Sequence, residues 1–122
     1  MDKQKKIQTI IDSGVVAVIR GTNADKVVEI ANALLAGGVK VLEITFDNPE
    51  AEDIVKTLSI EFEREDVVVG AGTVLDGETA RKAIIAGAEF VFGPTLNEDV
   101  IEVCNRYGKI VIPGVMTPTE MI

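Results

Sequence analysis

The chain has 122 residues, 20 of them acidic and 12 basic, which gives a formal net charge of −8. Apolar residues make up 47% of the sequence, enough for one hydrophobic core, and this length corresponds to one domain or part of one. The acidic balance argues against nucleic-acid binding, because a phosphate backbone rewards clusters of Lys and Arg. The apolar runs are too short to span a membrane, and the Lys-rich start is unlike a secretory leader. The expected compartment is the cytoplasm.

The sequence contains no histidine and a single cysteine, Cys104. The lack of histidine excludes Ser-His-Asp triads, Cys-His pairs and histidine-ligated metal sites. One cysteine cannot form an internal disulfide, and we expect Cys104 to pack on the inner face of a helix. Any catalysis must therefore use carboxylates, lysine, arginine, hydroxyls or backbone groups, and no cofactor is expected.

Short apolar runs alternate with amphipathic stretches along the whole chain. The apolar runs are rich in Val and Ile and mostly continuous, which is typical of strands buried on both faces of a parallel sheet. In chain order, the pattern predicts a helix over 3–12, a strand over 15–19, a helix over 24–36, a strand over 39–46, a helix over 49–62, a strand over 67–70, a helix over 77–86, a strand over 90–92, a helix over 98–107 and a strand over 110–112.

This alternation predicts an α/β fold built from right-handed βαβ units. The even spacing of the strands, without a single glycine-rich fingerprint after the first, favours a parallel βα-barrel of the TIM-barrel type over an open doubly wound sheet. A closed barrel needs eight strands and usually at least about 200 residues. We therefore expect residues 1–122 to form a single partial barrel domain that holds only the first five strands.

Active sites of βα-barrels lie at the C-terminal ends of the strands, so the residues expected there are the first candidates. Glu43 interrupts the apolar second strand, where a carboxyl has a raised pKa or needs a partner, and it is a candidate for acid–base chemistry. A structural glutamate paired with Arg20 is an equally good interpretation. Arg20, after the first strand, can clamp a carboxylate or phosphate, or be an ordinary rim arginine. Gly70-Ala71-Gly72-Thr73 offers backbone N–H groups and a hydroxyl to an anion, although turn glycines alone explain such a run more often.

Five motifs together resemble a known family. VVAVIR, GGVKVLEITF, VGAGTV, AGAEFVFGP and PGVMTPTE, from about residue 7 to the end, are similar in order and spacing to the 2-keto-3-deoxy-6-phosphogluconate (KDPG) aldolases, which include 4-hydroxy-2-oxoglutarate aldolases. The resemblance implies a class I aldolase on a (βα)₈ barrel, usually a trimer and without a metal. In such an enzyme, a lysine forms a Schiff base with pyruvate or its keto-acid adduct, and a glutamate moves the protons.

The resemblance also implies residue roles. Glu43 matches the proton-transfer glutamate, Thr73 matches the residue that holds the pyruvyl carboxylate, and Arg20 and Pro94 match positions that line the pocket. The chain departs from some members at Asp47, where they carry an arginine. The family's Schiff-base lysine lies on the sixth strand, which we expect near residue 130 or later. The family's phosphate site lies on loops after the seventh and eighth strands, so both would fall beyond this sequence.

Two other functions stay open at this stage. The chain can be a non-catalytic half-barrel that assembles with itself or with a complementary fragment. It can also belong to a neighbouring class of phosphate-binding barrel, an isomerase or synthase, although the GAGTV and PGVMTPTE motifs argue against that. The expected partners are a pyruvate-type keto acid and other copies of the chain.

Overall fold

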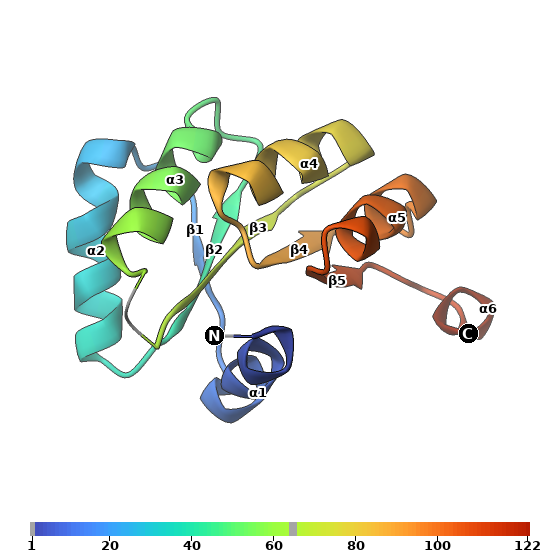
Figure 1. Ribbon diagram of the computed structural model, residues 1–122, viewed down its shortest axis with the longest axis horizontal. Helices are drawn as coiled ribbons and strands as arrows, with labels where there is room; N and C mark the ends of the chain where they lie inside the picture. The colour runs from blue at the N-terminus through green and yellow to red at the C-terminus, as the bar shows by residue number, and fades with distance from the viewer. Residues whose placement is uncertain (1, 64–65) are drawn as a thin grey trace.

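The computed structural model describes residues 2–63 and 66–122, in which strands and helices alternate. The elements are α1 (Lys3–Ser13), β1 (Ala17–Ile19), α2 (Ala24–Ala36), β2 (Val41–Thr45), α3 (Ala51–Glu61), β3 (Val68–Gly72), α4 (Gly77–Ala86), β4 (Phe90–Gly93), α5 (Glu98–Arg106), β5 (Ile110–Pro113) and α6 (Pro118–Met121). Figure 1 shows α2, α3, α4 and α5 side by side along one face of the sheet, and α1 away from this row of helices.

The five strands form one parallel sheet in the order β1-β2-β3-β4-β5. Each strand pairs with the strand that precedes or follows it in the sequence, which is the order of a βα-barrel. An open doubly wound sheet would reverse its strand order at a switch point. The predicted α/β class and the parallel barrel-type order are therefore confirmed for the part of the chain that the structure describes.

Strands β1 and β2 are shorter than predicted, several other ends shift by one residue, and two further differences lie close to the candidate residues. Strand β3 continues through Ala71 and Gly72, which were expected to follow the strand, because the β2 backbone pairs with β3 up to Gly72. Helix α3 begins at Ala51 instead of residue 49. Asn48 makes no N-cap there: its side-chain oxygen accepts a hydrogen bond from the Glu50 backbone N–H (2.9 Å), which closes a turn before the helix.

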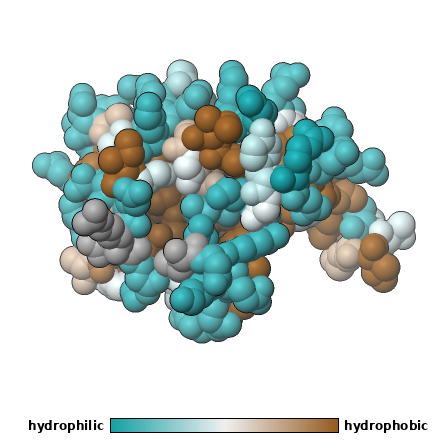
Figure 2. Space-filling view, viewed as in Figure 1, coloured by the Kyte–Doolittle hydropathy of each residue, from teal (hydrophilic) through white to brown (hydrophobic). Residues whose placement is uncertain are grey.

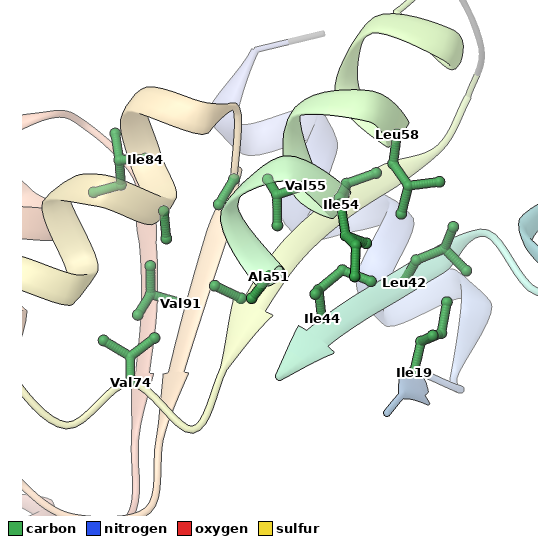
Figure 3. Packing of buried hydrophobic residues seen from close by; sticks show 14 of the residues in the cluster. Ile19, Leu42, Ile44, Ala51, Ile54, Val55, Leu58, Val74, Ile84 and Val91 are labelled. Atoms are coloured by element: carbon green, nitrogen blue, oxygen red, sulfur yellow. The ribbon is translucent and has the colours of Figure 1, made fainter. Parts of the chain in front are cut away.

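The larger part of the hydrophobic core lies between the sheet and helices α2 to α5. Alternate strand residues, among them Leu42, Ile44 and Val91, point toward these helices and meet Leu58 and Ile84 (Figure 3). Each fully buried aliphatic side chain of this kind contributes about 1.5–3 kcal/mol of transfer free energy. This packing fixes which strand residues point the other way.

The opposite face of the sheet corresponds to the inside of a barrel. Val41, Val68, Phe90 and Ile110 form a second cluster there, and Ile7 and Ile10 of α1 pack against it. Helix α1 thus covers the N-terminal ends of the strands.

The outer strands leave this inner face partly open. Val18 on β1 is 53% exposed and Ile112 on β5 is 47% exposed. By contrast, the face shown in Figure 2, where the helices lie, is mostly hydrophilic with separate hydrophobic spots. Among the described residues, no helix is long and apolar enough to cross a membrane.

Candidate active site

Glu43 lies in the middle of β2 and faces the inside of the incomplete barrel. Its neighbours Leu42 and Ile44 pack toward the helices, so the alternation of the strand turns Glu43 the other way. The residue is only 9% exposed. Its carboxyl group lies directly over Gly72 at the end of β3, where a Cβ atom would overlap Glu43 Oε1. The missing side chain of Gly72 therefore provides the space that the carboxyl group occupies.

The environment of Glu43 favours its protonated form. Burial raises the pKa of Glu43, and the positive charge of Arg20 offsets part of this effect. Within the described residues, no ion pair reaches its carboxyl group. A buried carboxyl with a raised pKa and no fixed partner is suited to take up and release protons.

Arg20 follows β1 and forms an ion pair with Asp47, which follows β2. The distance from Arg20 Nη1 to Asp47 Oδ2 is 2.7 Å, and both side chains are more than half exposed. The Thr45 hydroxyl, and after it the Arg20 guanidinium, hold the pKa of Asp47 below its ordinary value. The expected structural alternative, an ion pair between Arg20 and Glu43, is thus replaced by one with Asp47.

Thr73 follows β3 and has an unusual backbone conformation. Its φ angle of 56° is positive, and among the described non-glycine residues no other shows this. A β-branched side chain is disfavoured in this left-handed region, at a cost of about 1–3 kcal/mol. The next residue, Val74, is buried, and its N–H donates to the Phe92 carbonyl (3.2 Å). The turn is thus anchored on both sides of a strained residue at the C-terminal ends of the strands.

Pro94 follows β4 and lies against the chain that follows β5. Its carbonyl approaches Gly114 so closely that a Cβ atom on Gly114 would overlap the Pro94 oxygen. The strand topology therefore places Arg20, Thr73 and Pro94 after the C-terminal ends of their strands, as predicted from the chain order. The carboxyl group of Glu43, from the middle of β2, reaches Gly72 at that end of the sheet. Sequence patterns carried no signal for the strained φ angle of Thr73 or for the Arg20–Asp47 pair.

The lysines lie elsewhere. Lys40 and Lys109 precede β2 and β5, at the opposite end of the sheet, and Lys109 and Lys6 both bind Glu89 there (2.9 and 2.5 Å). The remaining lysines lie on helices; they are Lys3, Lys5, Lys26, Lys56 and Lys82. The described residues thus place no lysine beside Glu43.

Two further features bear on the chemistry of the described chain. No group of three or more His, Cys, Asp or Glu side chains within residues 2–63 and 66–122 could hold a metal ion. Cys104 is buried on the inner side of α5, as expected, and burial raises the pKa of its thiol to about 11. At that pKa the thiol is protonated at neutral pH and is a poor nucleophile.

Comparison with known proteins agrees with the sequence resemblance. Residues 7–122 match the model of the family described as KDPG and KHG aldolase. The chain is 37% identical over 107 residues to a 2-dehydro-3-deoxy-phosphogluconate aldolase of Treponema pallidum, covering 88% of this chain and 50% of the relative. It is 34% identical over 116 residues to the KHG/KDPG aldolase of Escherichia coli K12, covering 94% of this chain and 54% of the relative.

Solved structures show the same relationship. The crystal structure of the 2-keto-3-deoxy-6-phosphogluconate aldolase of Zymomonas mobilis ZM4 with 3-phosphoglycerate matches with a TM-score of 0.83 and 30% identity, over 97% of this chain and 55% of that one. KDPG aldolase from Legionella pneumophila, with pyruvate captured as a covalent carbinolamine intermediate, matches with a TM-score of 0.76 and 30% identity, over 87% of this chain and 50% of that one. The chain spans about half the length of the relatives that it matches. With the family match over residues 7–122, these findings show that the chain belongs to the KDPG and KHG aldolase family.

Proposed function

We propose that this chain provides the proton-transfer half of a class I aldolase site. The reaction would cleave 2-keto-3-deoxy-6-phosphogluconate to pyruvate and glyceraldehyde 3-phosphate, or 4-hydroxy-2-oxoglutarate to pyruvate and glyoxylate. The observation that carries the proposal is Glu43, a buried carboxyl with a raised pKa, no ion pair and a cleared space over Gly72. Family membership supplies the reaction class.

In this proposal Glu43 moves protons at two steps. A lysine first condenses with the keto group of the substrate and releases water, which leaves an imine that can accept electrons. Glu43 takes the proton of the C4 hydroxyl as the C3–C4 bond breaks, the aldehyde leaves, and the bonding electrons form an enamine. Glu43 then returns a proton to this enamine carbon, and water hydrolyses the imine to free the lysine and pyruvate.

Three other residues have supporting roles in the proposal. Thr73 would hold the pyruvyl carboxylate with its hydroxyl and the backbone N–H groups of its turn. Pro94 would line the pocket beside it, and Arg20 would line the rim above Glu43. The strained backbone of Thr73 supports this role, because strain of this kind gathers at ligand-binding turns.

The imine lysine must come from outside these 122 residues. Every lysine of the chain lies on a helix or at the N-terminal ends of the strands. The proposal therefore places the nucleophile in the strands that complete the barrel, either in the same polypeptide or in a complementary one. We infer a homo-oligomer for the completed protein, a trimer as the family resemblance implies, with no cofactor and a cytoplasmic location.

Borohydride trapping with pyruvate tests the proposal. The 122-residue chain alone should form no reduced pyruvate adduct, whereas the chain with the completing strands should gain one adduct on one lysine, measured by mass spectrometry. In the completed protein, Glu43→Gln should lower turnover by about 10²–10⁴-fold, because it removes the group that transfers the proton. Circular dichroism provides the control that the variant is folded. A stoichiometric adduct on a lysine of the isolated chain, or unchanged turnover in the variant, would contradict the proposal.

A second function is favoured by one observation, the exposure of Val18 and Ile112 on the inner face of the sheet. An apolar inner face of this kind supports a non-catalytic half-barrel that acts by assembly. A chain that assembles with itself but forms no pyruvate adduct in any assembly would support this function over the aldolase.

A further inference from the structure

Arg20 starts from the same face of the sheet as Glu43. In the parallel pairing of β1 with β2, Val18 lies opposite Glu43 and Ile19 lies opposite Ile44. Ile19 is buried on the helix side, so strand alternation directs Val18 and the following Arg20 toward the inside of the barrel. The charge of Arg20 acts on the Glu43 carboxyl group, although its hydrogen bond goes to Asp47. The Arg20 guanidinium thus binds the Asp47 carboxylate directly, and its charge also favours the ionised form of Glu43.

The turn that carries Asp47 is held against the loop after β1. The side-chain amide of Asn48 donates to the Thr22 carbonyl (2.9 Å), and its oxygen accepts from the Glu50 N–H (2.9 Å). A groove of about 370 Å³ runs between these two loops, and Asp47 forms part of its wall. The Asp47 carboxylate therefore has a fixed place at the rim, beside the end of β1.

We propose that Asp47 is a positioning residue, which binds Arg20 at the rim and so keeps the guanidinium from pairing with the Glu43 carboxylate. This inference rests on the proposed function, because it concerns how Glu43 stays available for proton transfer. A glutamate in a direct ion pair would be held in its ionised form and could not easily exchange its proton.

Among the described residues, Arg20 is the cation that affects the ionisation of Glu43, because the other elements around Glu43 bring no unpaired positive charge toward it. Strand β3 brings Gly70 and Gly72, which are uncharged. Helix α1 contacts β2 from the N-terminal end, and its Lys6 is bound by Glu89. Helix α3 packs on the far side of the sheet, where the residues that meet β2 are apolar.

The test is the pH dependence of turnover in the completed protein. In Asp47→Asn, Arg20 loses its partner and turns toward Glu43, whose ionised form it stabilises. The low-pH limb of the kcat profile, where Glu43 must lose its proton to act as a base, should then move to lower pH by about one unit. Asp47→Glu should restore the wild-type limb. The double variant Arg20→Met/Asp47→Asn should lack the downward movement, because the cation is gone.

The matched control is Asp66→Asn, which removes the same charge from an exposed ion pair with Lys40 at the opposite end of the sheet. Its limb should coincide with that of the wild type. The positioning role would be overturned if the low-pH limb of Asp47→Asn also coincided with that of the wild type, or if the substitution changed only KM. Pyruvate trapping with borohydride distinguishes failure of this inference from failure of the proposed function. If neither the completed wild-type protein nor any variant forms an adduct, the aldolase site itself is refuted.

Discussion

At the scale of single residues, Thr73 shows how this site differs from an ordinary turn. Glycine and asparagine accept a positive φ angle at little cost, whereas threonine does so only when its surroundings hold it there. The residue type therefore works against local stability. Such a conflict is expected where the side chain itself is needed, here for a hydroxyl that would hold the pyruvyl carboxylate.

Replacement of Thr73 by asparagine should separate the two effects. Thr73→Asn should raise the free energy of unfolding by about 0.5–1 kcal/mol, because asparagine tolerates the left-handed region. The same variant of the completed protein should bind pyruvate more weakly. Urea unfolding and pyruvate titration provide the measurements, and Thr95→Asn, at the turn after β4 where φ is not positive, is the control. A loss of stability in Thr73→Asn as large as in a core variant would show that the strain is not stored there.

At the scale of elements, strand β3 contributes space instead of a side chain at two of its positions, Gly70 and Gly72. Gly70 lies under the ring of Phe90, and Gly72 lies under the carboxyl of Glu43. The two glycines stand on the same face of one strand, two residues apart, yet they admit neighbours of opposite character. Gly70 leaves room for the Phe90 ring, and Gly72 leaves room for the buried carboxyl of Glu43.

Alanine at these two positions should therefore have different effects. Gly72→Ala should leave the fold nearly unchanged, because the end of a glutamate side chain can move, but should lower turnover of the completed protein by about 10²-fold. Gly70→Ala should instead lower the free energy of unfolding by about 1–3 kcal/mol, because the rigid Phe90 ring cannot yield as easily. Chemical unfolding and steady-state kinetics measure both. Gly37→Ala is the control, since Gly37 has an ordinary φ of −83° and only ordinary contacts. Equal losses of turnover and stability in both variants would contradict this division.

At the scale of the whole molecule, the sheet has two outer strands, β1 and β5, and a partly open inner face. Unpaired strand edges bind other chains, and exposed apolar surface beyond a few hundred Å² rarely persists in a monomer. The exposed apolar residues continue beyond β5, where Met116 and Met121 are 91% and 67% exposed. Helix α6, which carries Met121, lies apart from the other helices in Figure 1.

The 122-residue chain alone should therefore associate at micromolar concentration or bind hydrophobic dyes strongly. Analytical ultracentrifugation and dye fluorescence measure these properties, with the completed barrel as the control. The net charge of −8 slows aggregation but does not pair the strand edges. A compact monomer that unfolds cooperatively and binds no dye would show that the half-barrel is stable by itself.

The sequence by itself determined the order of elements and the end of the sheet at which the candidate residues lie. Continuous Val- and Ile-rich runs separated by amphipathic stretches are typical of a buried parallel sheet, and Glu43 stands out because it is a carboxylate inside such a run. These features depend on residue type and spacing, which a single chain displays directly. The order of strands and helices alone is enough to place the residues that match the family motifs at the C-terminal ends of the parallel strands.

Only the tertiary structure decided which partner each of these residues takes. The sequence offered both Glu43 and Asp47 as partners for Arg20, and in the structure the ion pair goes to Asp47, on the turn that Asn48 closes. The positive φ angle of Thr73 likewise arises from the anchoring of Val74 against β4, not from its own preference. The physical reason is common to both. Which of two possible contacts forms depends on the distances between groups on different strands and loops, and those distances are fixed only when the strands and loops have packed together.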